Sequence, residues 1–153
     1  MSAQILPDFH DAADALAPRR AQGATVALAN GCFDVLHVGH VRLLREAALA
    51  ADLLVVALNT DASVSANKGA GRPHVPLSER MEVIAALAGV DVVTSFAEAT
   101  AGPLLVTLKP DVHVKGTDWT AETVPERDVV LAYGGRVLIA GDEKTHSSSA
   151  LIE

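Results

Sequence analysis

Short apolar segments alternate with amphipathic ones along most of this chain, and that alternation constrains the fold more than any other feature. The apolar segments, such as 53–58 (LLVVAL), are strand-sized and lack the polar alternation of a half-exposed strand. Strands that are apolar throughout are typical of parallel sheets, whose two faces are both covered by helices. We therefore predict an α/β fold with five parallel strands, at 24–29, 53–58, 91–95, 111–115 and 136–140.

The segments between these strands place their apolar residues at helical spacing, so we expect helices on both faces of the sheet. A helix at 8–20 would form part of an N-terminal helical extension over residues 1–22, with Pro18 fraying or closing it. A length of 153 residues suits one domain, so we predict a single Rossmann-like domain over residues 1–153. Further helices are expected to begin near residues 39, 61, 78, 101 and 122.

Composition narrows the class of protein. The chain has 12 Lys and Arg against 19 Asp and Glu, a net charge of −7, and half of its residues are hydrophobic. This acidic balance argues against a long nucleic-acid interface, although it allows a small basic pocket for one nucleotide. No apolar run approaches the roughly 18 residues that span a bilayer. The single Cys32 excludes an internal disulfide, and the acidic N-terminus lacks a secretory signal, so we expect a cytoplasmic protein.

The segment 30–40, NGCFDVLHVGH, carries the chemistry, because it follows the first buried strand and opens a helix. His37 and His40 flank Gly39 at the helix start, where backbone N–H groups can meet an anion. Imidazoles placed there can donate hydrogen bonds to phosphate oxygens and stabilise a phosphoryl transition state. Two other interpretations stay open. One histidine caps the helix while the other packs in the core, or both bind one metal ion, although no acidic or cysteine ligand is obviously paired with them.

These residues resemble a known family. GCFDVLHVGH matches the HxGH motif of the nucleotidyltransferase superfamily, which includes cytidylyltransferases, pantetheine-phosphate adenylyltransferases and class I aminoacyl-tRNA synthetases. The blocks LNTDASV, KGAGRPHVPLSERM, GVDVVTSFAEAT and KPDVHVKGTDW are similar to the heptose-1-phosphate adenylyltransferases that make ADP-heptose. This resemblance covers roughly residues 24–152. It implies transfer of AMP from ATP to D-glycero-D-manno-heptose 1-phosphate, with release of pyrophosphate.

The resemblance also implies roles for particular positions. His37, His40 and Lys115 fall on catalytic positions, and they bind the nucleotide together with Cys32, Phe33, Gly39, Lys68, Asp118, Ser147, Ser148 and Ser149. Substrate-binding roles are implied for Asp34, Arg72 and Arg80. Simpler interpretations stay open: a small structural residue at 32, a solvated loop lysine at 68, a surface arginine at 80, a turn-stabilising Asp118 and serines that only cap a helix. His146 stands where cytidylyltransferases carry an arginine.

The implied reaction needs no general base, because the attacking sugar phosphate is already anionic at neutral pH. Positioning and positive charge must instead overcome the repulsion between two anions. We expect Mg²⁺ as the cofactor, carried by the ATP phosphates and water rather than by protein carboxylates. The expected partners are ATP and a sugar phosphate, with no nucleic acid and no membrane, and the resemblance implies a homodimer or higher homo-oligomer.

Two rival functions remain. The first is a cytidylyltransferase that uses CTP with glycerol-3-phosphate or a similar phospho-alcohol. The second is a nucleotide-binding module without turnover. A serine hydrolase is disfavoured because Ser147–Ser149 lack a nucleophile-elbow context, and a dehydrogenase because the first turn lacks G-x-G-x-x-G.

Overall fold

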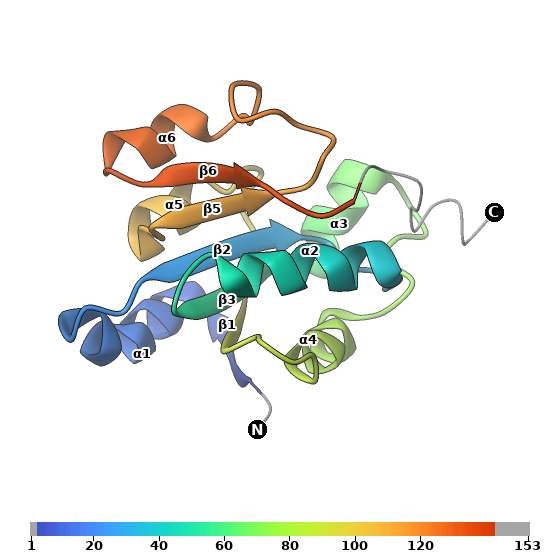
Figure 1. Ribbon diagram of the computed structural model, residues 1–153. Coiled ribbons are helices and arrows are strands. Elements are labelled where there is room, and N and C mark those ends of the chain that lie inside the picture. Colours follow the sequence, from blue (N-terminus) through green and yellow to red (C-terminus); the bar gives the residue numbers. More distant parts are fainter. Residues whose placement is uncertain (1–2, 143–153) are drawn as a thin grey trace.

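The structure, a computed structural model, describes residues 3–142 and contains one six-stranded parallel sheet with helices on both faces (Figure 1). The strand order is β1-β4-β3-β2-β5-β6. This confirms the predicted α/β class and each of the five predicted strands, but the predicted strand count was wrong by one. The strands are β1 (Gln4–Asp8), β2 (Val26–Gly31), β3 (Leu53–Asn59), β4 (Val92–Phe96), β5 (Val112–Lys115) and β6 (Arg136–Ile139).

The additional strand, β1, lies in the segment that we interpreted as wholly helical. It pairs with the outer edge of β4, with Ile5 opposite Val93. Its sequence, QILPD, is largely exposed and contains Pro7, so it has neither the apolar run nor the alternation that predicts a strand. Proline cannot donate to a ladder and is tolerated only at a sheet edge or an irregularity, which is where this strand lies.

The helix predicted at 8–20 is α1 (Phe9–Ala21), and the side chain of Asp8 caps it by accepting a hydrogen bond from the backbone N–H of His10 at 2.8 Å. Pro18 lies inside this helix and does not end it. Arg20, in the last turn, donates to the carbonyl oxygens of Leu108 and Lys109, which ties the end of the helix to the body of the domain. Tertiary contact therefore outweighs the local effect of the proline.

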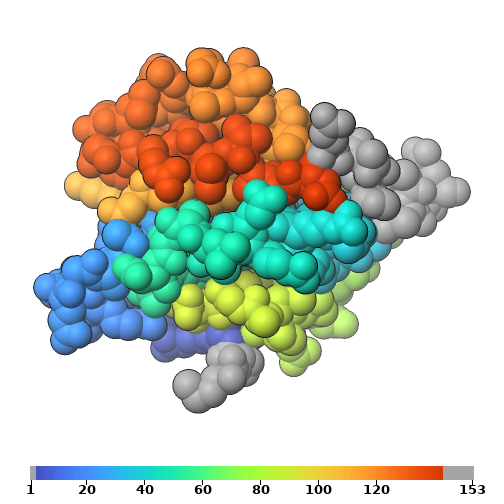
Figure 2. Space-filling model, in the orientation of Figure 1, coloured from blue at the N-terminus to red at the C-terminus, as the bar shows by residue number. Residues whose placement is uncertain are grey.

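Two apolar layers enclose the sheet. On one face lie α2 (Val38–Leu49) and α4 (Leu77–Ala85), and Figure 2 shows α2 as a band across this face with α4 beside it. On the other face lie α1, α5 (Gly102–Leu108) and α6 (Arg127–Ala132). All seven residues of β3 are buried between these layers, which accounts for the apolar run over its first six residues, 53–58. None of the helices in the described range combines the length and apolarity needed to cross a membrane.

The order of the strands reverses at β2. From β2 the chain builds outward through β3 and β4, and it then crosses to the opposite side of β2 to add β5 and β6. In open parallel sheets, ligands bind in the crevice outside the carboxyl ends of the strands at such a switch point. Here those ends are Gly31 of β2 and Lys115 of β5. The arrowheads of both strands point to the right in Figure 1. The remaining helix, α3 (Asp61–Lys68), follows β3 at the same edge.

Candidate active site

The two histidines of the HxGH motif stack on each other at the start of α2. Their ring centroids are 4.0 Å apart, with an angle of 29° between the ring planes. His37 is the N-cap residue, and its Nδ1 accepts a hydrogen bond from the backbone N–H of Gly39 at 3.1 Å. Nδ1 of His40 accepts from the backbone N–H of His37 at 3.2 Å. The histidines therefore cap the helix reciprocally, as a serine and a glutamate do in a capping box.

This capping determines which ring nitrogen carries the proton. A ring nitrogen that accepts a hydrogen bond is unprotonated, so each neutral imidazole of His37 and His40 carries its proton on Nε2. The ring of Phe33 packs edge-on against the ring of His40, with 5.3 Å between the two centroids. Neither histidine belongs to the buried core, so the core-packing interpretation is wrong. The capping interpretation is confirmed, because Nδ1 of each ring takes part in the cap at the positive end of the helix.

The residues before the histidines form a sharp turn. Phe33 has a φ of 48°, in the left-handed region, and its ring is buried over Gly31. A Cβ at Gly31 would lie 3.3 Å from the Phe33 ring, so a glycine permits this close approach. Sγ of Cys32 lies 3.8 Å from the amide oxygen of Asn59, and the residue is partly exposed. The turn directs the backbone from the end of β2 toward the start of α2.

Asp34, predicted to bind substrate, instead holds a neighbouring loop. Its side chain is fully buried and accepts hydrogen bonds from the backbone N–H groups of His74 and Val75, both at 2.9 Å, and from Nε of Arg72 at 2.8 Å. Burial by itself would raise the pKa of Asp34, but these hydrogen bonds outweigh it and lower the pKa below its ordinary value. The carboxylate therefore stays ionised and fastens the loop after α3 to the HxGH segment.

Arg80, also predicted to bind substrate, is fully buried in the structure. Its guanidinium donates to the carbonyl oxygens of Val75, Cys32 and Asn59 at 2.8–2.9 Å, and to Oδ1 of Asp61 at 2.6 Å. With its side chain inaccessible and these donors in use, Arg80 does not face a substrate. It joins the HxGH turn, the end of β3 and the start of α3, so its role here is to position them. The interpretation as a surface arginine is wrong, because the side chain is buried.

Lys68 and Arg72 belong to the segment that leaves the sheet edge after β3. Lys68 is the last residue of α3 and is exposed. Arg72 is mostly buried against Asp34, and its second terminal nitrogen, Nη2, is buried with no hydrogen-bond partner in the described part of the chain. Such a nitrogen is unusual, because buried polar atoms in proteins nearly always have a hydrogen-bond partner. Ser147, Ser148 and Ser149, like His146, lie outside the described residues.

Lys115 ends β5 at the switch point. The side chain is partly buried and, within residues 3–142, its ammonium group makes no hydrogen bond or salt bridge. Burial lowers the pKa of Lys115, while the nearby groups of Glu126, Asp118 and Cys32 act to raise it. Asp118 itself lies on the exposed loop after the strand. Lys115 therefore lies at the end of a strand beside the switch point, and its catalytic role stays a prediction.

No part of the sequence prediction assigned a role to His113. The ring lies in the middle of β5, is fully buried, and has its Nε2 2.7 Å from Oδ1 of Asn30. Its Nδ1 has no hydrogen-bond partner among the described residues. The only signal in the sequence is a histidine inside an otherwise apolar strand segment, DVHVK. Within residues 3–142, no cluster of three histidine, cysteine or carboxylate side chains could hold a metal ion.

The burial of His113 predicts a specific acid sensitivity. Burial, followed by repulsion from Lys115, lowers the pKa of His113 from 6.5 to about 3. Between these values the unfolded chain binds a proton that the folded chain does not, so stability falls as the pH falls. We expect His113 to reduce the free energy of unfolding by about 2 kcal/mol between about pH 8 and about pH 5. Urea unfolding of the wild type and of His113→Leu across this range measures the difference, and parallel pH curves would contradict it.

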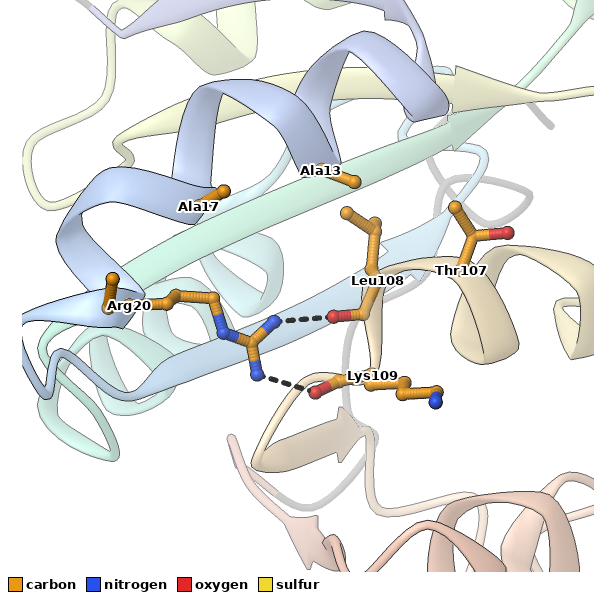
Figure 3. A pocket seen from close by; sticks show the side chains of 7 residues that line it. Ala13, Ala17, Arg20, Thr107, Leu108 and Lys109 are labelled. Atoms are coloured by element: carbon orange, nitrogen blue, oxygen red, sulfur yellow. Dashed lines mark hydrogen bonds between the residues drawn. The ribbon is translucent and has the colours of Figure 1, made fainter.

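A shallow hollow of about 500 Å³ lies at the opposite end of the sheet, between the ends of α1 and α5 (Figure 3). Ala13 and Ala17 line one side, and Arg20 reaches across to the carbonyl oxygens of Leu108 and Lys109. These oxygens end a helix and have no helical partner of their own, so Arg20 caps them. The hollow is thus accounted for by helix capping and is remote from the carboxyl edge of the sheet.

Comparison with known proteins identifies the family of this chain. A family model described as cytidylyltransferase-like matches residues 28–152. The bifunctional protein HldE of Pseudomonas fluorescens (strain SBW25) is 48% identical over 134 residues, which are 88% of this chain and 28% of that protein. The bifunctional protein HldE of Caulobacter vibrioides is 50% identical over 133 residues, 87% of this chain and 28% of that protein. The chain thus spans less than a third of the length of these relatives.

A solved structure has a similar fold. The lipopolysaccharide core biosynthesis protein from Thermoplasma volcanium GSS1 superposes with a TM-score of 0.68 and 26% sequence identity, covering 80% of this chain and all of that one. These matches confirm the resemblance to the HxGH nucleotidyltransferases that the motif indicated. The chain therefore belongs to the cytidylyltransferase-like family of nucleotidyltransferases.

Proposed function

We propose that this protein transfers AMP from ATP to a sugar 1-phosphate, D-glycero-D-manno-heptose 1-phosphate, and so forms ADP-heptose and pyrophosphate. One observation carries the proposal more than any other. The reciprocal capping of His37 and His40 presents two Nε2–H donors at a helix N-terminus, at the switch point where Lys115 also lies. Donors and positive charge arranged in this way suit the phosphate chain of a nucleotide.

In this reaction an oxygen of the sugar phosphate attacks the α-phosphorus of ATP. A new phosphorus–oxygen bond forms, the bond between the α-phosphorus and the bridging oxygen breaks, and pyrophosphate leaves with that oxygen. The nucleophile is already an anion, so no side chain needs to remove a proton. The imidazoles of His37 and His40 and the ammonium of Lys115 would stabilise the charge that develops on the transferred group and on the leaving pyrophosphate.

The acceptor anion would approach from the loop after α3. Arg72 brings a buried, unpartnered guanidinium nitrogen to that loop, and Asp34 orients the same guanidinium through Nε. Lys68 adds a second, exposed cation from the end of α3. Two basic side chains on this segment suit a phosphate monoester, and we propose that Arg72 meets the sugar phosphate while Lys68 meets the nucleotide phosphates.

Magnesium fits this arrangement as an ion that the triphosphate brings. The described residues provide no cluster of carboxylates or histidines for a metal ion, whereas Mg²⁺ is commonly held by phosphates and water with one or two carboxylates at most. Asp118, exposed beside the crevice, is the carboxylate that we propose to meet the nucleotide or its metal ion. When bound, Mg²⁺ would neutralise charge on the phosphates.

The choice of ATP and heptose over CTP and glycerol-3-phosphate is supported by the relatives. Two are named HldE and a third is a lipopolysaccharide core biosynthesis protein. The sequence blocks RPHVPLSERM and VKGTDW also resemble those of the heptose subgroup.

Pyrophosphate release measured with two nucleotides and two acceptors tests the assignment. We expect ATP with the heptose 1-phosphate to exceed CTP with glycerol-3-phosphate by at least about 10²-fold in kcat/KM, because a site that hydrogen-bonds one substrate rejects an analogue that leaves its polar groups unpaired. Each anomer of the sugar phosphate is assayed separately. Preference for CTP and glycerol-3-phosphate would favour the rival cytidylyltransferase. Nucleotide binding without pyrophosphate release from any pair would favour a module without turnover.

A further inference from the structure

Asn30 and His113 lie on neighbouring strands beneath the candidate active site. In the β2–β5 pair, Leu28 is opposite His113 and Ala29 is opposite Val114, so continuing the register brings Asn30 beside Lys115. Residues that alternate along a strand share a face, and opposite residues of a parallel pair share it too. Asn30, His113 and Lys115 therefore occupy one face of the sheet at the carboxyl ends of β2 and β5, the strands that flank the switch point.

The buried histidine fixes the orientation of the Asn30 amide. Its Nε2 lies 2.7 Å from Oδ1 of Asn30, which can only accept, so Nε2 carries the proton and donates. Because burial lowers the pKa of His113 to about 3, the ring is neutral at physiological pH and this donor is permanent. The amide is thus held with Oδ1 toward His113 and with Nδ2 on the side away from it.

Two donors remain at this point without acceptors. Within residues 3–142, neither Nδ2 of Asn30 nor the ammonium group of Lys115 makes a hydrogen bond, and both residues are only partly buried. A neutral amide donor beside a cation matches an oxygen of an anion, and the anions that this fold binds at its switch point are phosphates. Glu126 and Asp118 act to keep Lys115 charged, but neither forms a salt bridge with it.

Packing alone does not account for His113. A fully buried ring nitrogen without a partner costs about 1–3 kcal/mol, and an aliphatic side chain in the same strand would avoid that cost. A role in orienting a ligand-binding group would explain why a destabilising histidine stands at this position. Asn30 also lies close in the chain to the HxGH motif. It directly precedes the turn Gly31-Cys32-Phe33, which leads to the two histidines.

We propose that Asn30 is a substrate-binding residue that donates a hydrogen bond from Nδ2 to a phosphate oxygen beside Lys115, and that His113 is the positioning residue that orients the Asn30 amide. This inference rests on the proposed function, because it takes the phosphate to be that of ATP or of the sugar phosphate. If the phosphate belongs to ATP, removing the Nδ2 donor lowers the affinity for ATP. If it belongs to the sugar phosphate, the affinity for the sugar phosphate falls instead.

A double-mutant cycle tests the inference. We expect Asn30→Ala to lower kcat/KM by about 10- to 100-fold, the effect of one hydrogen bond to a charged group, and Asn30→Asp to lower it further because it sets an anion against the phosphate. His113→Leu, which keeps an apolar volume but loses the donor, should cause a smaller loss. In the Asn30→Ala background, His113→Leu should cause no additional loss, because its effect passes through Asn30. His113→Gln, which keeps a donor, should recover part of the activity.

The readouts separate this inference from simple stabilisation and from the proposed function. Melting curves establish that each variant is folded at the assay temperature, with His10→Leu as the control at an exposed histidine. Calorimetric titration with Mg·ATP and with the sugar phosphate identifies the affected ligand. Unchanged affinity for both in Asn30→Ala, or additive losses in the double variant, would overturn the inference. A wild type that binds these ligands but releases no pyrophosphate would refute the proposed function instead, and the titrations would still test Asn30.

Discussion

Replacing His40 with alanine is expected to reduce pyrophosphate release by about 10²- to 10³-fold, the effect of removing one preorganised donor from a developing negative charge. The loss should appear in kcat, because the hydrogen bond from Nε2 strengthens as charge moves onto the transferred phosphoryl group. The substitution also removes the Nδ1 acceptor that caps the backbone N–H of His37, at a cost of about 1 kcal/mol in stability. The protein should therefore stay folded while it loses activity.

The measurement is steady-state pyrophosphate release, with melting temperature recorded on the same samples. His10→Ala is the matched control, because His10 is exposed at the start of α1, beside the edge strand β1, which β4 and β3 separate from β2. It should retain wild-type activity. A His40→Ala variant that releases pyrophosphate at the wild-type rate would remove the histidines from the mechanism.

Replacing Arg80 with methionine is expected to destabilise the fold by about 3 kcal/mol, since it leaves buried carbonyl oxygens without their donor. The affected oxygens belong to Val75, Cys32 and Asn59. Methionine keeps most of the side-chain volume, so the loss reports hydrogen bonding more than a cavity. Asp61, the acidic partner, is half-exposed and can be rehydrated, which limits the penalty.

Urea unfolding gives the free energy of unfolding for this comparison. Arg45→Met, at an exposed position of α2, is the control and should change stability by no more than about 0.5 kcal/mol. Arg80→Lys should recover only part of the loss, because an ammonium group cannot reproduce the spread of the guanidinium donors. If Arg80→Met instead kept full stability and raised only the KM of the acceptor, the original substrate-binding prediction would be correct and the positioning role wrong.

The sequence predicted those parts of the fold whose signals are local. β3 was predictable because its first six residues, 53–58, are an unbroken apolar run, and the start of α2 because the glycine and the histidines lie within a few residues of each other. β1 was missed because a short, exposed edge strand with Pro7 carries little hydrophobic pattern, and its stability comes from pairing with β4. Pairing of this kind joins residues far apart in the chain.

The distinction between local signals and long-range contacts also explains which site residues could be predicted. The HxGH motif gave the position of His37 and His40, but the roles of Asp34 and Arg80 depend on contacts between distant parts of the chain. Asp34 contacts Arg72, 38 positions away, and Arg80 contacts Cys32, 48 positions away. Residue type and motif position indicated charge near the substrates, whereas only the folded chain reveals that both groups point inward and hold loops together. His113 shows the converse, because a lone histidine in a strand has no distinguishing pattern until its contact with Asn30 is seen.

The central claim is that Nε2–H of His37 and His40 meets the phosphates of a nucleotide, and nitrogen-15 NMR of the imidazoles tests it most directly. The His37→Ala and His40→Ala variants assign the two rings in a uniformly labelled sample. We predict that both rings are neutral with an unprotonated Nδ1 and a protonated Nε2, and that Mg·ATP shifts the Nε2 signals while Nδ1 keeps its acceptor character. Rings protonated on Nδ1, or Nε2 signals that do not move at saturating Mg·ATP, would contradict the account.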